Sequence, residues 1–261
     1  GVDVPDSDKL RGTPVKGPLN VAFYQARPRE ATMKSEVFDF DSSYQGDGYV
    51  VDFQIGKTTS SGGTDFEMVV DDGTGGTPIP GGTYDFSGGH QTWDVAGFDL
   101  AGYDPGTLAM GTGPNFNRTP KTDEEFYAQL DVEYDVDYGV VTQIKTGFKY
   151  ADHNTTSLRY EFQQVAGFDN IISTSGLNSE LIDIGAGDYQ MTLFDAEQLK
   201  DIAKASITGE TEDLGAHSEI DEKNTSAYVM ASFEGDGFRG NAGVRYTHTS
   251  ATSTYYVDGQ L

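Results

Sequence analysis

The chain has 261 residues, enough for one large domain or two ordinary ones, and 42 acidic residues against 17 Lys and Arg give a formal charge of −25. Such a negative field repels phosphate backbones, so we expect no nucleic-acid partner. With no cysteine, the chain has neither a disulfide nor a thiolate metal site, and its four scattered histidines lack metal-site spacing, so we expect no metal.

Hydropathy argues against two further classes of segment. No run of 18 apolar residues occurs, and no charged region followed by an apolar run opens the chain, so we expect neither a transmembrane helix nor a signal peptide. A transmembrane β-barrel remains compatible, because its apolar side chains alternate with polar ones and give a weak hydropathy signal.

The first alternating segment surrounds the sequence YQGDGY, residues 44–49. Apolar side chains take every second position before it, at Phe38 and Phe40, and again after it, from Tyr49 to Ile55. A second copy, FEGDGF at residues 233–238, has the same flanks. Period-two alternation indicates strands, so each copy is predicted to join two strands of a hairpin.

Gly-Asp-Gly also permits a second interpretation, as a calcium loop. Each copy offers only one carboxylate in the turn, whereas a calcium loop needs several oxygen ligands at set spacing, so the turn is the favoured interpretation. The aromatic residues beside the turns suit an interfacial girdle of a barrel and equally suit ordinary cross-strand pairing in a soluble sheet.

Residues 57–122 are rich in Gly, Thr, Pro and Asp and are predicted to form a long extracellular loop. Long loops are uncommon in compact domains and frequently carry function. Four aromatic or imidazole side chains in this loop are candidate ligand contacts: Tyr84, His90, Trp93 and Tyr103. The alternative is that these residues only fold the loop onto itself.

The strongest alternation runs from Glu124 to Tyr150. Apolar side chains occupy even positions from Phe126, polar ones the odd positions, and the turn is predicted at residues 137–139. A further strand is predicted at residues 157–164, with DHNTT, residues 152–156, as the connection before it.

Residues 164–223 are predicted to form a second long loop that contains a short helix. In DAEQLKDIAKA, residues 195–205, Asp195 is placed to cap the helix, while Leu199, Ile202 and Ala203 share one face. Short turns at one end of the strands and long loops at the other are typical of an outer-membrane barrel.

The predicted fold class is therefore all-β. We expect antiparallel up-and-down strands of an incomplete transmembrane β-barrel, with residues 1–261 forming part of a single barrel domain. No carboxylate pair is marked by a catalytic motif, so we assign no catalytic residue, no enzymatic activity and no cofactor.

Residues 221–256, DEKNTSAYVMASFEGDGFRGNAGVRYTHTSATSTYY, closely resemble a barrel segment of TonB-dependent outer-membrane receptors. Residues 144–162, IKTGFKYADHNTTSLRYEF, look like an earlier strand region of the same barrel, and the short helix resembles those in its extracellular loops. A whole receptor of this family has a 22-stranded barrel, a plug and a TonB box. This chain shows seven or eight predicted strands and no recognisable plug, so it resembles a part of one.

The resemblance implies a location in the outer membrane of a Gram-negative bacterium. The intact receptor would bind a scarce nutrient, a carbohydrate or a siderophore, at its extracellular loops and import it with energy from the TonB system. Its partners would be outer-membrane lipid, the TonB system and an extracellular small-molecule or oligosaccharide ligand.

Two alternatives from other classes remain. A soluble, secreted all-β module that binds carbohydrate or acts as an adhesin would show the same alternation, but its apolar faces would meet in one closed core. A calcium-dependent β-roll hydrolase would need nonapeptide repeats, which the sequence lacks.

Overall fold

The computed structural model describes the backbone of residues 16–19, 24–72, 82–85, 92–94, 99–184 and 189–257, and the side chains of residues 24–72, 99–183 and 190–257. Strands dominate, and the only α-helix in the described ranges is α1. The elements are β1 (Lys16–Leu19), β2 (Gln25–Ala26), β3 (Arg29–Gly46), β4 (Tyr49–Met68), β5 (Val70–Asp72), β6 (Gly82–Asp85), β7 (Thr92–Asp94), β8 (Thr107–Met110), η2 (Gly113–Asn115), β9 (Phe116–Tyr138), β10 (Val141–Ser157), β11 (Tyr160–Gln164), β12 (Ile171–Ser173), η3 (Thr174–Gly176), β13 (Ser179–Ile184), β14 (Tyr189–Phe194), α1 (Ala196–Ser206), β15 (Ile207–Glu212), η5 (Leu214–Ala216), β16 (Ser218–Gly235) and β17 (Phe238–Tyr255).

The chain divides into two compact units, where the sequence predicted one barrel domain. Unit 1 comprises Gly1–Glu30, Phe66–Asn117 and Glu161–Thr211, and unit 2 comprises Ala31–Asp65, Arg118–Tyr160 and Glu212–Leu261. Each unit is thus assembled from three stretches of chain. No helix in the described part of the chain is long and apolar enough to cross a membrane.

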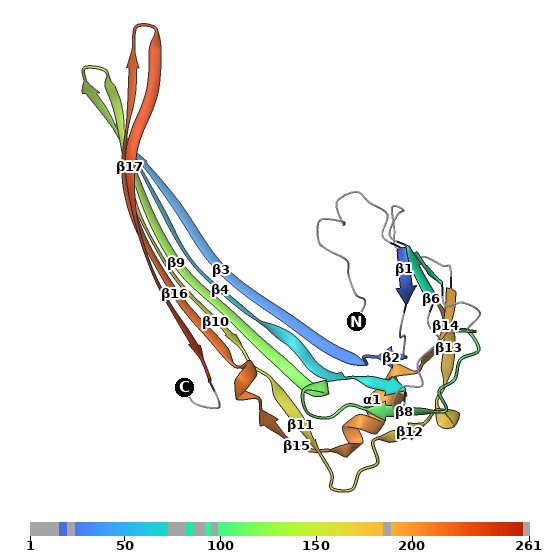
Figure 1. The fold of residues 1–261 in the computed structure, drawn as a ribbon. Coiled ribbons are helices and arrows are strands. Elements are labelled where there is room, and N and C mark those ends of the chain that lie inside the picture. The colour runs from blue at the N-terminus through green and yellow to red at the C-terminus, as the bar shows by residue number, and fades with distance from the viewer. Residues whose placement is uncertain are drawn as a thin grey trace. The chain divides into compact units, whose positions relative to one another are not determined.

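Unit 2 is built on long antiparallel strands that lie side by side (Figure 1). They pair in the order β3, β4, β9, β10, β16, β17, so neighbours alternate in direction along the sheet. The prediction of an all-β fold with antiparallel up-and-down strands is confirmed. These strands have between 17 and 23 residues, against a typical strand of about 5–6 residues.

Two-residue turns join the long strands in pairs. Asp47-Gly48 connects β3 to β4 and Asp236-Gly237 connects β16 to β17, so both Gly-Asp-Gly sequences are turns, as predicted. The β9–β10 turn is Gly139-Val140, at the end of the segment where a turn was expected. The glycine in each turn has a φ of 74°, 82° or 63°, a left-handed value that suits glycine and tightens the reversal.

The first glycine of each Gly-Asp-Gly sequence has a different role. The Tyr49 ring lies against the backbone of Gly46, and the Phe238 ring lies against that of Gly235, so a side chain at either glycine would collide with the ring. Gly235 and Phe238 are direct register partners across the hairpin. The repeated motif therefore combines a glycine that the aromatic ring covers with a glycine that reverses the chain.

Several expected boundaries differ in the structure. The DHNTT sequence is not a connection: it lies within β10, whose pairing with both neighbours continues to Ser157. β4 extends to Met68 and β9 begins at Phe116, so the first long connection is shorter than 57–122. The second begins after β11 and ends where β16 starts at Ser218, and it contains α1 and several short strands.

The buried apolar side chains belong to unit 1. The cluster comprises Tyr24, Phe66, Met68, Val70, Leu108, Met110, Phe116, Ile172, Phe194, Leu199 and Ala203. Its aromatic rings pack closely, with the centroids of Phe66 and Phe116 5.8 Å apart and those of Phe116 and Phe162 5.1 Å apart. These rings join residues from separate stretches of chain into one closed core.

Helix α1 contributes to this core and confirms the predicted helix. The Asp195 side chain accepts hydrogen bonds from the backbone N–H groups of Glu197 and Gln198, while Leu199 and Ala203 are buried. On the same helix, Lys200 and Lys204 both donate to the Glu30 carboxylate, at 3.2 and 2.7 Å. The helix is therefore held to the core by apolar contacts and to Glu30 by two ammonium groups.

Replacing Asp195 by alanine should destabilise unit 1 by about 0.5–2 kcal/mol, because two backbone N–H groups lose their acceptor. The measurement is denaturant unfolding followed by the fluorescence of the single tryptophan, which belongs to this unit. Asp201→Ala, at an exposed position of the same helix, is the matched control and should change the free energy of unfolding by less than about 0.5 kcal/mol. Equal effects of the two variants would contradict the capping role.

The Glu30 cluster should make unit 1 less stable in acid. Hydrogen bonds from Lys204 and Lys200 hold the pKa of Glu30 below its ordinary value of 4.5. A carboxyl group with a lowered folded-state pKa adds stability that is present above the unfolded pKa and is lost as the pH falls through the folded pKa. We expect Glu30→Gln to reduce the unfolding midpoint at pH 7 and to approach wild type below pH 4.5. A difference between the two proteins that does not change over this window would contradict the linkage.

Candidate functional site

The two faces of the unit 2 sheet differ in character. In one row across four strands, Leu130 pairs with Phe148, Phe148 with Ala227, and Ala227 with Tyr246. Side chains alternate along each strand, so these apolar positions share a face and the polar positions between them share the other. We call the two sides the apolar face and the polar face.

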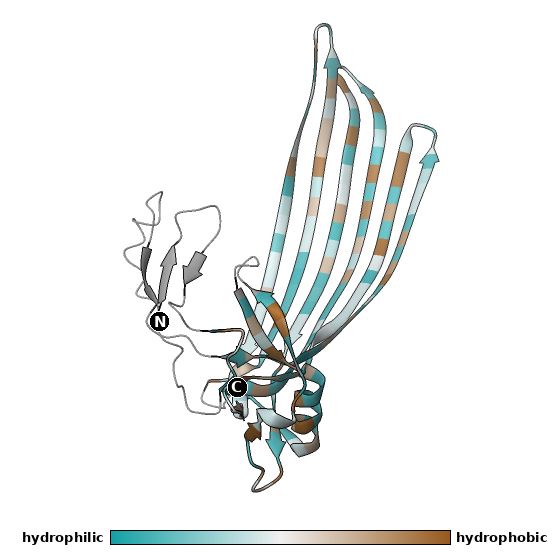
Figure 2. Ribbon diagram, turned by 90° about the vertical axis from the view of Figure 1, so that its right-hand side faces the viewer, coloured by the Kyte–Doolittle hydropathy of each residue, from teal (hydrophilic) through white to brown (hydrophobic). Residues whose placement is uncertain are grey.

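The apolar face is exposed. Among its side chains, Phe148 is 49% exposed, Val244 68% and Tyr246 70%. Figure 2 shows apolar and polar residues alternating along the long strands, with the apolar bands concentrated toward the ends that carry the two-residue turns. No large apolar side chain of unit 2 is buried in the described ranges. An apolar face that is exposed across several long strands indicates an interaction surface.

The polar face carries two adjoining cavities. One has a volume of about 480 Å³ and is lined by Gln129, Asp131, Lys145, Tyr228, Val229, Met230, Gly243, Val244 and Arg245. The second has about 330 Å³ and is lined by Asp41, Ser42, Ser43, Asp52, Phe53, Gln54, Gln129 and Asp131. Gln129 and Asp131 line both, so the cavities meet at β9. The larger cavity is the candidate functional site.

Two glycines lie among the long side chains on this part of the sheet. In one row, Asp131 pairs with Gly147, Gly147 with Tyr228 and Tyr228 with Arg245. In the next row, Lys145 pairs with Met230 and Met230 with Gly243. Gly147 leaves room for the Tyr228 ring to lie across the sheet, and Gly243 lines the cavity without a side chain of its own.

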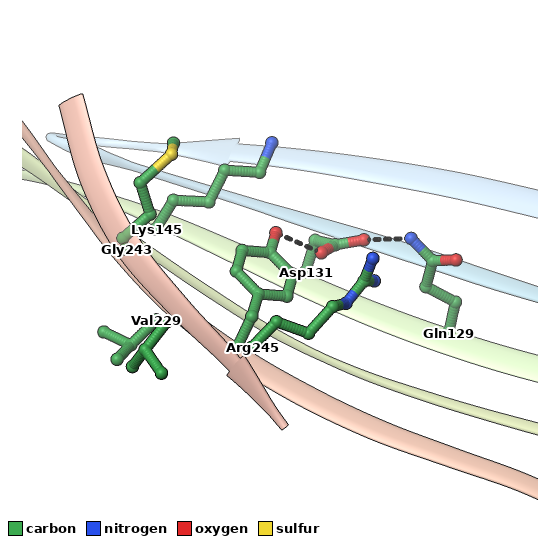
Figure 3. Close-up of a pocket in the computed structure, with 9 residues that line it drawn as sticks. Gln129, Asp131, Lys145, Val229, Gly243 and Arg245 are labelled. Atoms are coloured by element: carbon green, nitrogen blue, oxygen red, sulfur yellow. Dashed lines mark hydrogen bonds between the residues drawn. The ribbon is translucent and has the colours of Figure 1, made fainter. Parts of the chain in front are cut away.

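The Tyr228 side chain crosses Gly147 to reach β9. Its hydroxyl donates to Asp131 Oδ1 at 2.5 Å, and Gln129 Nε2 donates to Asp131 Oδ2 at 2.6 Å (Figure 3). A side chain at residue 147 would collide with both Asp131 and Tyr228. Both oxygens of Asp131 are therefore occupied, and the carboxylate has a fixed position on the cavity wall.

A second bridge with the same design crosses β4. Tyr127 of β9 donates to Asp39 Oδ1 of β3 at 2.8 Å, and its ring lies where a side chain at Gly56 would be. Tyr–Gly–Asp bridges thus span three neighbouring strands on each side of β9. They hold the polar face by side-chain hydrogen bonds in addition to the backbone ladder.

The cationic groups of the larger cavity have different environments. Lys145 forms an ion pair with Glu133. The guanidinium carbon of Arg245 lies 5.6 Å from the centre of the Tyr228 ring, and Arg245 has no ion pair or hydrogen bond with any residue that the structure describes. Figure 3 shows Arg245, Asp131 and Gln129 extending over the polar face while Val229 points to the opposite side. Arg245 therefore offers free donors to a solute in this cavity.

The four residues expected to contact a ligand lie away from this cavity in the sequence and belong to unit 1. The structure brings two of them together, because Tyr84 of β6 and Trp93 of β7 are direct register partners. Their side chains and the whole of His90 lie outside the described residues. The ligand-binding role of these residues stays a prediction.

Tyr103 is the fourth of these residues. Its side chain is half-buried and packs against the unit 1 core. Burial, and then the carboxylates of Asp72 and Asp104, raise the pKa of the Tyr103 hydroxyl above its ordinary value. This environment fits the alternative considered for the loop, in which its aromatic residues fold it onto itself.

Within the described ranges, no group of three or more acidic or histidine side chains is arranged to hold a metal ion. The larger cavity was not predicted from the sequence, because its residues come from four strands whose register decides which side chains meet. The available signal was the pair of glycines, Gly147 and Gly243, at polar-face positions of strands that otherwise alternate strictly.

Comparison with known proteins gives weak structural similarity only. No protein-family model and no curated protein matches the sequence. Among solved structures, the chain is similar to BauA, the ferric preacinetobactin receptor from Acinetobacter baumannii, with 13% sequence identity and a TM-score of 0.27. The match covers 86% of this chain and 35% of the receptor chain, so this chain spans about a third of its length.

Proposed function

We propose that the chain is a segment of an outer-membrane β-barrel receptor of the TonB-dependent kind, which binds and imports a scarce nutrient. The observation that carries this proposal is the exposed apolar face of unit 2. A soluble sandwich would cover such a face with a second sheet, whereas a barrel strand turns it toward lipid.

The dimensions of the apolar face agree with a membrane. On β9 its apolar positions run from Phe126 to Tyr138, about 40 Å along the strand at ~3.3 Å per residue. At a tilt of ~45° that length spans about 28 Å, close to the ~25 Å apolar band of outer-membrane barrels. Aromatic residues occur at both ends, with Phe126 near Tyr150 at one end and Tyr138 at the other.

The polar face suits the inside of such a barrel. Its carboxylates, amides and free guanidinium would contact water and solutes, while the apolar face contacts lipid. In this proposal the nutrient is a small molecule or an oligosaccharide, the intact receptor engages the TonB system, and the protein carries out no catalysis. Of the candidate loop residues, Tyr84, His90 and Trp93 would contact the nutrient at the extracellular side, whereas Tyr103 packs against the unit 1 core.

Membrane fractionation of the native full-length protein tests the location. We expect it in the outer-membrane fraction, extracted only by detergent, with slower migration on gels after boiling than before. If the purified 261-residue chain is monomeric and soluble without detergent and unfolds cooperatively, the soluble carbohydrate-binding or adhesin-like module becomes the better interpretation.

A further inference from the structure

We propose that the larger cavity on the polar face binds a solute that carries a carboxylate beside hydroxyl groups, such as a sugar acid, with Arg245 as the anion-binding residue. The idea that the solute reaches the cavity from a barrel lumen rests on the proposed function. Binding of the solute depends only on the geometry of unit 2.

Arg245 is the group in the cavity that selects for charge. Among the described residues its guanidinium has neither an ion pair nor a hydrogen bond, and its carbon lies 5.6 Å from the centre of the Tyr228 ring. A guanidinium donates two parallel hydrogen bonds to a carboxylate, a geometry that an ammonium group cannot match. Stacking on Tyr228 restricts the side chain and so lowers the entropic cost of binding.

The nearby carboxylate does not neutralise Arg245 by direct contact. Asp131 accepts from Tyr228 at one oxygen and from Gln129 at the other. These two bonds hold Asp131 in place and leave the Arg245 donors available. Lys145 is paired with Glu133, so Arg245 is the cation of the larger cavity without an acidic partner in the described chain.

The rest of the wall offers acceptors for hydroxyl groups. Gln129 uses its amide nitrogen on Asp131, which leaves its carbonyl oxygen free to accept. The Tyr228 hydroxyl donates to Asp131 and retains acceptor capacity. A volume of about 480 Å³ lies within the ~300–1,000 Å³ of small-molecule sites. One cationic side chain for a carboxylate, beside two acceptors for hydroxyl groups, matches a sugar acid better than a neutral sugar or a simple anion.

The test uses the full chain in a neutral detergent and isothermal titration calorimetry with D-glucuronate, against D-glucose as the uncharged comparison. We expect wild type to bind glucuronate more tightly than glucose, and added salt to weaken glucuronate binding. Arg245→Gln should lose about tenfold or more in glucuronate affinity, because a charged hydrogen-bonding partner is removed, while its weak affinity for glucose stays unchanged.

Arg239→Gln is the matched control. Arg239 lies on β17 and on the same face, has no ion pair in the described chain, and is not part of the cavity wall. This variant should bind glucuronate like wild type. Equal losses in both variants, equal affinity for glucuronate and glucose, or no glucuronate binding at all would overturn the inference.

The binding experiment and the fractionation experiment can fail independently of each other. If fractionation places the protein outside the outer membrane but Arg245→Gln still abolishes glucuronate selectivity, the barrel proposal fails and the binding site stands. If the protein fractionates with the outer membrane and glucuronate binding is absent, the barrel proposal stands and the binding site fails.

Discussion

Replacing Ile144 by arginine is expected to block assembly of the protein in the outer membrane. Ile144 lies on the apolar face of β10, opposite Tyr134 and Ala231, and is 39% exposed. In a barrel this position faces lipid, where an arginine costs up to about 2–4 kcal/mol near the midplane. The measurement is the fraction of protein recovered in the outer membrane in its heat-modifiable, folded form.

The matched control adds the same charge at the preceding residue. Gln143 precedes Ile144, is half-buried and lies on the polar face, so Gln143→Arg should assemble like wild type. In a soluble protein the expected result for Ile144→Arg reverses, because an arginine in place of an exposed isoleucine is then tolerated. Equal assembly of the two variants would therefore contradict the lipid-facing assignment.

Replacing Gly147 by valine is expected to destabilise the sheet of unit 2 by about 1–3 kcal/mol and to remove glucuronate binding. The new side chain would occupy the space in which Tyr228 reaches Asp131, so that hydrogen bond would break and both of these cavity residues would be displaced. Thermal unfolding and calorimetry with glucuronate measure the two effects separately.

Gly240→Val is the control for the glycine substitution itself. Gly240 lies on β17, its backbone is not left-handed, and a side chain there meets no atom within 4 Å. Valine favours strands, so this variant should be at least as stable as wild type and should bind glucuronate normally. If Gly147→Val behaves like Gly240→Val, the Tyr228–Asp131 bridge has no structural role.

The sequence predicted the strands where one face is apolar. From Phe126 to Tyr150, alternation predicts two strands and the side chains that share a face, because a shift of one residue would exchange the faces. The turn residues between the two strands predict the hairpin. The two Gly-Asp-Gly turns were predictable for the same reason, since each lies between two alternating segments.

Prediction failed where polar side chains continue a strand. DHNTT lacks apolar alternation, yet its strand pairs continue, and side-chain hydrogen bonds replace apolar contacts across it. His153 Nε2 lies 2.8 Å from Asp123 Oδ2, and Thr155 donates to the same carboxylate oxygen at 2.8 Å. Hydropathy does not detect such a segment, because its stability depends on partners about thirty residues away.

The candidate site was harder to predict than the fold. Arg245 and Asp131 are over a hundred residues apart, and only the register of β9, β10, β16 and β17 brings them to one cavity. A sequence without aligned relatives does not fix that register between separate hairpins. The sequence therefore predicts ligand contacts in the long loop, at aromatic residues such as Trp93.

The two-residue turns also have a consequence for the order of folding. Each long hairpin closes almost no loop when it forms, whereas pairing β4 with β9 and β10 with β16 must enclose whole connecting segments and costs more chain entropy. We therefore expect three hairpins to form first and to join later. Unit 1 collects its core from both connections, so its apolar collapse would shorten those segments and speed the joining of the hairpins.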